Sequence, residues 1–212
     1  MPGEIRSLFL DGLAGRLEAL LNAGDAQPQR AAVVCHPHPM FGGTMHNKVV
    51  YHAAKALNRF GYPVLRFNFR GAGLSDGEHD AGRGEQDDVR TALDWLKREF
   101  GVPIIFAGFS FGAAVGLRVA CGDAGVTACV AIGMPVSAEG RNYSYGFLSG
   151  CSKPKLFVSG ARDQYASSAD LKRVVEAAPG PKKLVLVEGA DHFFAGKLDQ
   201  MRAAIEEWVE GL

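Results

Sequence analysis

The sequence predicts one α/β domain, in which a mostly parallel central sheet carries helices on both faces and follows an antiparallel hairpin. Short apolar runs alternate with longer helical segments along the chain, which is the pattern of parallel strands joined by helices. Of the 212 residues, 47% are apolar and 22% are charged, a composition that fits a sizeable core. No repeat, low-complexity tract or long linker divides the sequence, so we expect a single domain over residues 1–212.

The strands are predicted from short apolar runs bounded by turn residues. They are expected at residues 5–10, 16–21, 31–35, 63–67, 103–107, 126–132, 156–159 and 184–187. The first two flank the turn Asp11-Gly12 and therefore predict the hairpin.

The helices are predicted from apolar residues at helical spacing. They are expected at residues 47–60, 84–100, 111–121, 168–177 and 197–210. In the first, Val49, Ala53 and Leu57 share one face. The second begins with acidic residues in its first turn, which favours a helix N-terminus, and the last places Met201 and Ile205 on one face.

Residues 108–112 read Gly-Phe-Ser-Phe-Gly, with Ser110 between an apolar strand and a helical run of small residues. A sharp turn from strand to helix strains the serine backbone and lifts its hydroxyl above the sheet. The two glycines let strand and helix approach closely. The pattern alone is weak in a chain with 27 glycines, but its context predicts a nucleophile. The alternative is an ordinary helix-capping serine.

Asp163 and His192 are the candidate partners of Ser110, because each follows an apolar run and their order is the one this type of site uses. A serine hydroxyl needs a base to take its proton, and we assign that role to His192. Asp163 would hold the imidazole in the right tautomer. The alternatives are a hydrogen-bonded loop histidine, a turn or capping aspartate, and Asp191 as the acid.

Four segments carry a resemblance to a known family. They are His36-Pro37-His38-Pro39 with Gly42-Gly43-Thr44-Met45, then Phe67-Asn68-Phe69-Arg70-Gly71-Ala72-Gly73-Leu74-Ser75, the serine turn, and Gly160-Ala161-Arg162-Asp163 with Gly189-Ala190-Asp191-His192. The chain resembles small serine hydrolases of the α/β-hydrolase superfamily, of the lid-less bacterial group similar to dienelactone hydrolases and predicted esterases. Ser110 stands where dienelactone hydrolases carry a cysteine.

The resemblance covers nearly the whole chain and implies an α/β-hydrolase fold, with Asp163 in the position of the acid. It implies hydrolysis of a small carboxylic ester or thioester through an acyl-enzyme on Ser110. Because residues 134–153 are too few for more than a turn or one short helix, we expect no substantial lid.

Attack on an ester carbonyl develops negative charge, which needs N–H donors held in place. We expect one donor from Phe111, directly after the nucleophile and at a helix N-terminus. The second should come from residues 36–43, where two prolines lack an N–H and His38, Met40 and Phe41 can donate. The resemblance favours His38, with Met40 next. The alternative is that this loop is only a rigid turn.

Loops at the carboxyl ends of the strands should form the substrate site. Phe41, Tyr143 and Phe193 lie in such loops and are expected to line an apolar pocket for the acyl or alcohol group. Arg70 leaves the strand at 63–67 beside this site. It either binds an acidic substrate group or pairs with one of the aspartates at 87 and 88 as a structural clamp, which is the interpretation we favour.

Several function classes are disfavoured. The formal net charge is zero, with 23 basic and 23 acidic residues, so no nucleic-acid partner is expected. The histidines at 36 and 38 lack further ligands at metal-binding spacing, and the glycine run at 71–77 lacks dinucleotide-binding spacing, so we expect neither metal nor cofactor. The longest apolar stretch contains the serine turn, which argues against a membrane span.

The four cysteines, Cys35, Cys121, Cys129 and Cys151, show neither Cys-x-x-Cys spacing nor the density of a disulfide scaffold. They are expected to be reduced and mostly buried. Together with an N-terminus that lacks the apolar core of a signal peptide, this predicts a cytoplasmic protein.

The primary hypothesis is therefore a serine esterase. The alternatives are a non-catalytic module of the same fold that binds a ligand, and a peptidase or lactonase that uses the same three residues. The natural substrate and the oligomeric state are not set by the sequence.

Overall fold

The computed structural model describes residues 4–138 and 141–212, and its main sheet has eight strands. The strands are β1 (Ile5–Gly12), β2 (Gly15–Asn22), β3 (Ala31–Cys35), β4 (Val64–Phe67), β5 (Ile104–Phe109), β6 (Val126–Ile132), β9 (Lys155–Gly160) and β10 (Lys182–Val187). The α-helices are α1 (Lys48–Asn58), α2 (Gly84–Phe100), α3 (Phe111–Gly122), α4 (Ser168–Ala177) and α5 (Leu198–Glu210). The predicted α/β class is confirmed.

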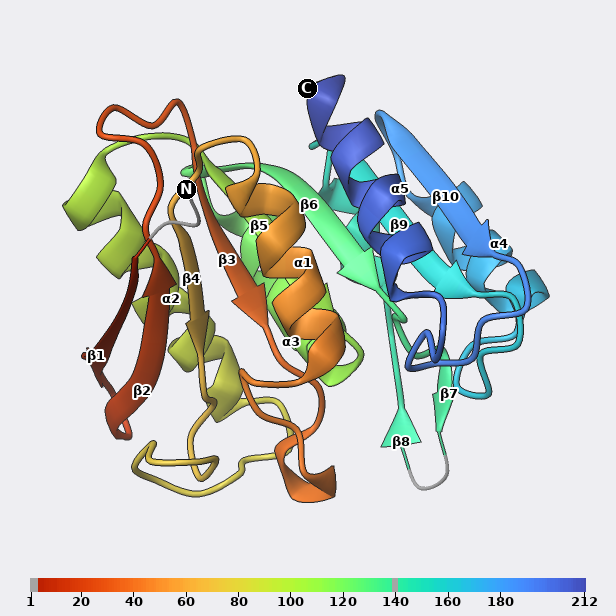
Figure 1. The fold of residues 1–212 in the computed structure, drawn as a ribbon. Helices are drawn as coiled ribbons and strands as arrows, with labels where there is room; N and C mark the ends of the chain where they lie inside the picture. Colours follow the sequence, from red (N-terminus) through yellow and green to blue (C-terminus); the bar gives the residue numbers. More distant parts are fainter. Residues whose placement is uncertain (1–3, 139–140) are drawn as a thin grey trace.

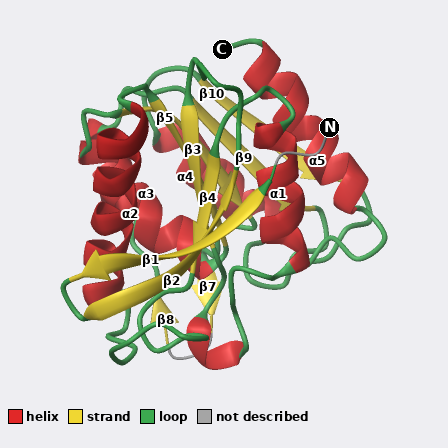
Figure 2. Cartoon of the chain, turned by 60° about the vertical axis from the view of Figure 1, so that its left-hand side comes forward, coloured by secondary structure: helices red, strands yellow, loops and turns green. Residues whose placement is uncertain are grey.

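The sheet runs in the order β1-β2-β4-β3-β5-β6-β9-β10. Strand β2 is antiparallel to both β1 and β4, whereas the pairs from β4 to β10 are parallel. Figure 2 shows the β1–β2 hairpin crossing the front of the molecule at a steep angle to β3 and β4. The predicted N-terminal hairpin is therefore confirmed, and the start of β2 contacts the loop after β4, where the Arg16 N–H donates to the Asp76 carboxylate.

Two helical layers cover the sheet (Figures 1 and 2). Helices α1 and α5 pack on one face, where their apolar stripes join strand residues in one buried cluster. Helices α2, α3 and α4 cover the opposite face and share the second cluster. Because both faces are buried, β3 and β4 contain only buried residues, as expected for central parallel strands.

The chain changes direction across the sheet at β3, which lies between β4 and β5. Figure 1 shows the carboxyl ends of β3 and β4 at the lower edge of the sheet. Ligand sites of open parallel sheets lie at such a reversal, outside the carboxyl ends of the strands. Ser110 directly follows β5, so the fold places it at this position.

The loops at this edge contain small elements that the sequence pattern did not predict. They are the 3-10 helices η1 (Pro39–Phe41) and η2 (Gly146–Gly150) and the short strands β7 (Ser137–Ala138) and β8 (Arg141–Asn142). In the described part of the chain, the connection from β6 to β9 holds only β7, β8 and η2, which agrees with the predicted lack of a substantial lid. Strand β5 also runs to Phe109, beyond the predicted end at 107, because residues 108 and 109 still pair with β6.

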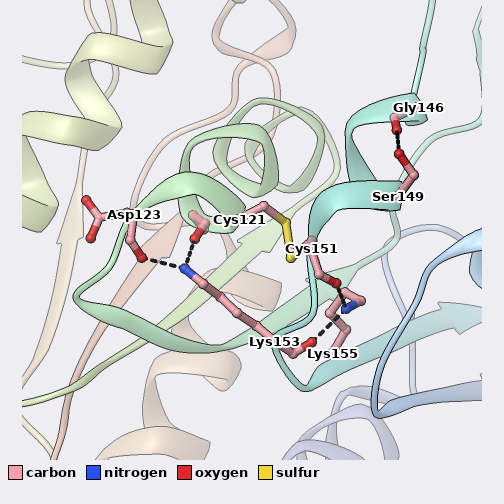
Figure 3. The surroundings of a disulfide bond; sticks show 8 residues. Cys121, Asp123, Gly146, Ser149, Cys151, Lys153 and Lys155 are labelled. Carbon is pink, nitrogen blue, oxygen red and sulfur yellow. Dashed lines mark hydrogen bonds between the residues drawn. A yellow bond between two sulfur atoms is a disulfide. The ribbon is translucent and has the colours of Figure 1, made fainter.

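Cys121 at the end of α3 and Cys151 after η2 form a disulfide (Figure 3). The prediction that all four cysteines are reduced was therefore wrong for this pair, while Cys35 and Cys129 are free and buried. The pair is 30 residues apart in the sequence, and only the packing of η2 against α3 brings the two Cα atoms within 5.2 Å. Cytoplasmic disulfides are rare, so this bond removes the main basis for predicting a cytoplasmic location.

Lys153 reinforces the same connection. Its Nζ donates hydrogen bonds to the carbonyl oxygens of Ala120 and Asp123 at the end of α3 (Figure 3). A cation at a helix C-terminus also interacts favourably with the helix dipole. The helix that begins at the candidate nucleophile is thus anchored at its far end.

Within the described residues, none of the helices has the length and apolar character needed to cross a membrane.

Candidate active site

Ser110 occupies the sharp turn between β5 and α3, with φ 54° and ψ −119°. A positive φ is unfavourable for a residue with a side chain and persists only where surrounding contacts fix it. Here the Ser110 N–H donates to the carbonyl oxygen of Ile132 at 2.9 Å, and the Ser110 carbonyl accepts from the Ala114 N–H at 3.0 Å. The predicted strained turn is present, and α3 begins immediately after the serine.

The two flanking glycines are required by close backbone contacts. A Cβ atom at Gly108 would lie 2.6 Å from the carbonyl oxygen of Gly112. A Cβ atom at Gly112 would lie 2.5 Å from the carbonyl oxygen of His36 and 2.7 Å from the backbone of Cys35. Backbone atoms of β3 and its loop cannot move aside as a flexible side chain could, so these positions need glycine.

Three side chains distant in sequence meet above the carboxyl edge of the sheet. His192 Nε2 lies 3.0 Å from Ser110 Oγ, and His192 Nδ1 lies 2.8 Å from Asp163 Oδ2. His192 and Asp163 are 2% and 6% exposed, so their interaction is shielded from solvent. With the Nδ1–H donating to the carboxylate, Nε2 has its lone pair toward the serine hydroxyl.

The rival acid Asp191 does not reach the imidazole. One of its carboxylate oxygens accepts the backbone N–H groups of Phe193 and Ala195 at 3.1 and 3.0 Å. These bonds shape the loop that carries His192. Asp191 thus has a local structural role, and Asp163 is the carboxylate that contacts the histidine.

Sequence reasoning missed the residues that hold this arrangement. The Tyr165 N–H donates to Asp163 Oδ1 at 2.8 Å, and the Ser159 hydroxyl donates to Asp163 Oδ2 at 3.3 Å. The ring of Tyr165 lies edge-on to the imidazole of His192 at 4.6 Å, and Phe109 packs against the same imidazole at 5.0 Å. An aspartate that bonds the N–H two residues later is a recognisable turn motif, so Asp163-x-Tyr165 was the available signal.

A cavity of about 430 Å³ opens at Ser110 and His192. The predicted substrate-binding residues Phe41, Tyr143 and Phe193 all line it, and Tyr165 joins them. Its other lining residues are Pro37, His38, Gly42, Gly43, Asn47 and Pro135. Apart from His192 and His38, these side chains are aromatic, small or uncharged, which suits a neutral organic group.

The loop after β3 places His38 beside this cavity, where its ring packs against that of Phe111 at 4.6 Å between centroids. The N–H of Met40 donates to His38 Nδ1 at 3.2 Å, and the N–H of Phe41 donates to the His38 carbonyl oxygen at 3.1 Å. Both bonds close the 3-10 turn η1. Met40 also does not line the cavity, so the prediction of Met40 as an oxyanion donor is not supported.

His36 is buried and connects two loops of the site. Its Nδ1 donates to the carbonyl oxygen of Pro37 at 2.6 Å, and its Nε2 accepts the N–H of Phe69 at 2.9 Å. Burial lowers the pKa of His36 from 6.5 to about 4. His36 is therefore a neutral structural residue that ties the loop after β3 to the loop after β4.

Arg70 is not among the residues that line the cavity, so the structure does not support its expected role in substrate binding. Its guanidinium donates to both carboxylate oxygens of Asp88, the shortest bond being 2.7 Å from Nη2 to Oδ1. These hydrogen bonds raise the pKa of Arg70. The clamp favoured by the sequence is present with Asp88, whereas Asp87 pairs with Arg90.

In the described residues, no group of three His, Cys, Asp or Glu side chains is arranged to hold a metal ion.

Comparison with known proteins agrees with this fold. The sequence model of the alpha/beta hydrolase domain family matches residues 30–208. A protein of unknown function from Agrobacterium tumefaciens has a structure similar to this chain, with a TM-score of 0.90 and 32% identity over 97% of this chain and 95% of its own.

Two further solved structures carry a description of their chemistry. An alpha-beta serine hydrolase homologue from Coxiella burnetii is 35% identical over 98% of this chain and 97% of its own, with a TM-score of 0.86. A serine hydrolase without a lid from Xanthomonas campestris is 32% identical over 99% of this chain and 95% of its own, with a TM-score of 0.85. These likenesses confirm the fold predicted from the four sequence segments.

Proposed function

The chain belongs to the alpha/beta hydrolase family and is an enzyme of the hydrolase type. On that premise we propose that it cleaves a small carboxylic ester or thioester through an acyl-enzyme on Ser110. The observation that carries the proposal is the unbroken chain of short contacts from Ser110 through His192 to Asp163. A non-catalytic module has no need for this alignment at a strained turn.

In the proposed reaction, Ser110 Oγ attacks the carbonyl carbon while His192 Nε2 takes the hydroxyl proton. The carbonyl oxygen becomes an oxyanion, and Asp163 stabilises the imidazolium that forms. As the bond to the leaving group breaks, His192 passes the proton to the departing alkoxide or thiolate. A water molecule then attacks the acyl-serine by the same route, which releases the acid and restores the serine hydroxyl.

The proposed oxyanion donors are the backbone N–H groups of Phe111 and His38. Phe111 is the first residue of α3, so its N–H has no partner within the helix and lies at the positive end of the helix dipole. His38 is proposed because it lines the cavity together with Ser110 and its ring packs against Phe111, which carries the other proposed donor. Each such donor typically contributes about 2.7–4 kcal/mol to transition-state stabilisation.

The proposed substrate is a small molecule, in keeping with a cavity of about 430 Å³. The proposal includes no cofactor and no nucleic-acid or membrane partner. The cytoplasmic location expected from the sequence is not carried into it, because the Cys121–Cys151 bond favours an oxidising environment.

The test is hydrolysis of p-nitrophenyl acetate by the wild-type protein and by Ser110→Ala. We expect Ser110→Ala to lose at least about 10⁴-fold in turnover. Ser7→Ala, an exposed serine in β1 at the sheet edge, is the matched control and should retain full activity. Equal rates for wild type and Ser110→Ala would reject the proposal.

A fluorophosphonate probe makes the test independent of the choice of ester. The probe phosphonylates an activated serine hydroxyl, so mass spectrometry of the labelled protein should place the adduct on Ser110. Labelling should be absent in Ser110→Ala and strongly slowed in His192→Ala. Labelling at another serine would contradict the assigned nucleophile.

A further inference from the structure

A second cavity of about 640 Å³ adjoins the catalytic one. The two share His38 and Tyr143 as lining residues, so they meet beside the candidate oxyanion hole. The second cavity lies between the start of α2, the N-terminal half of α3 and residues 143–145. The proposed reaction as described above makes no use of it.

The wall that α3 contributes is a single helical stripe. Phe111, Ala114, Val115 and Arg118 all line the second cavity, at the spacing that places residues on one face of a helix. The stripe starts at the residue after the nucleophile, continues over two small apolar side chains and ends at a cation. Seven residues of α-helix put Arg118 about 10 Å beyond Phe111, and helical side chains lean back toward the N-terminus.

The charge of Arg118 is not neutralised by a carboxylate among the described residues. Its Nη2 donates to the Ser144 carbonyl oxygen at 3.1 Å, and its guanidinium lies 4.6 Å from the centre of the Phe147 ring. Both partners are neutral and hold the group in place. Arg83, a second lining residue, pairs with Asp80, and none of the described lining residues carries a carboxylate. The lining residue His79 contacts the buried carboxylate of Glu85, so Arg118 is the cation of the described wall that no described carboxylate pairs with.

The position of His192 decides which half of the substrate points toward Arg118. The base must return its proton to the leaving oxygen, so the alcohol lies on the side of His192, Tyr165 and Phe193 in the catalytic cavity. The acyl group extends from the carbonyl carbon away from the leaving group. The second cavity, which shares His38 and Tyr143 with the catalytic one, offers space for this group.

We infer that the second cavity is an acyl-binding subsite, and that the substrate is an ester whose acyl chain ends in an anionic group held by Arg118. This inference rests on the proposed function and specifies its substrate class. The small side chains of Ala114 and Val115 leave room for an extended chain, and the carboxylate of a half-esterified dicarboxylic acid has the charge and planar shape that a guanidinium binds well.

The test compares monomethyl adipate with methyl hexanoate, which match in chain length and differ in the terminal carboxylate. We expect the wild type to favour monomethyl adipate over methyl hexanoate by about tenfold or more in kcat/KM. In Arg118→Gln the ratio of the two kcat/KM values should fall close to one. Monomethyl succinate, whose chain is too short to reach Arg118, should show no preference. The matched control is Arg173→Gln, an exposed arginine on α4 that should leave both rates unchanged.

The non-reacting Ser110→Ala protein supplies a readout besides activity. Adipate should bind to it in calorimetry, with affinity that falls at high salt and is lost in the Ser110→Ala/Arg118→Gln double variant. A wild type that hydrolyses both esters at equal rates would overturn the inference while leaving the proposed function intact. Loss of both rates to the same extent in Arg118→Gln would overturn it as well, because that is the effect of a merely structural residue. No Ser110-dependent hydrolysis of any ester would reject the proposed function itself.

Discussion

His192 Nε2 lies 3.0 Å from Ser110 Oγ, although 82 residues separate them in the sequence. The two side chains come from loops after different strands, and each loop is fixed by its own backbone hydrogen bonds. The imidazole also packs against the rings of Phe109 and Tyr165. The base is therefore positioned before substrate arrives, which is the preorganisation that catalysis by a serine hydroxyl requires.

Substitutions of Ser110 and His192 should reduce turnover non-additively, because the two residues act as one unit. We expect His192→Ala to lower turnover of p-nitrophenyl acetate by about 10⁴-fold, and Ser110→Ala/His192→Ala to be no worse than either single variant. Asp163→Asn should be slightly milder, because the histidine keeps its place but loses its carboxylate partner. Steady-state kinetics of the four variants measures this. Full activity of Asp163→Asn would refute the role of that residue.

Gly112→Ala should both destabilise the protein and reduce its activity. The new methyl group would press on the backbone of β3 and of the following loop, which bears the second proposed oxyanion donor. Overpacking of this kind costs about 1–3 kcal/mol in the free energy of unfolding. Gly122→Ala at the end of the same helix is the control, because a Cβ atom at that position would have no neighbour within 4 Å. Chemical denaturation that finds the two variants equally stable would contradict the packing argument.

Arg70→Ala should lower the free energy of unfolding by about 3–5 kcal/mol, because it leaves the fully buried carboxylate of Asp88 without its cation. Burial already raises the pKa of Asp88 despite its bonds to Arg70. Arg90→Ala removes an exposed pair with Asp87 and should cost less than about 1 kcal/mol. Urea denaturation distinguishes the two. If Arg70→Ala were as stable as the wild type and had an altered KM, the result would favour a substrate-binding role for Arg70 over the structural clamp.

Stability should fall as the pH drops from 6.5 toward 4, because of His36. The folded protein keeps His36 neutral down to about pH 4, whereas the unfolded chain takes up a proton near pH 6.5. In that window the unfolded state binds more protons, so the free energy of unfolding decreases, by on the order of 3 kcal/mol at the low end. His36→Gln should flatten this part of the pH profile, and the exposed His46→Gln should not. An unchanged slope in His36→Gln would refute the assignment.

Reduction of the Cys121–Cys151 bond should destabilise the protein by about 3–4 kcal/mol, since the bond closes a loop of 30 residues. Urea denaturation with and without reductant measures the loss, and Cys121→Ser/Cys151→Ser should no longer respond to reductant. Thiol titration of the unfolded, non-reduced wild type should find the two remaining cysteines. Four titratable thiols would show that the bond does not form in the isolated protein.

Local patterns predicted the candidate nucleophile because its requirements are local. The glycines around Ser110 and the change from strand to helix are visible in a few adjacent residues. The positions of Asp163 and His192 after apolar runs were sufficient to predict that they meet, because the carboxyl ends of parallel strands lie at one edge of the sheet. The same reasoning could not identify the supporting contacts of Tyr165 and Ser159, which depend on the path of each loop.

The sequence by itself determined the alternation of strands and helices, the hairpin and the nucleophile turn, since periodicity and backbone strain act over a few residues. Only the tertiary structure decided that Cys121 pairs with Cys151, that Arg70 clamps Asp88, and that a second cavity containing Arg118 adjoins the catalytic one. Each of these is a distance between groups far apart along the chain, and such distances are set by how the elements pack.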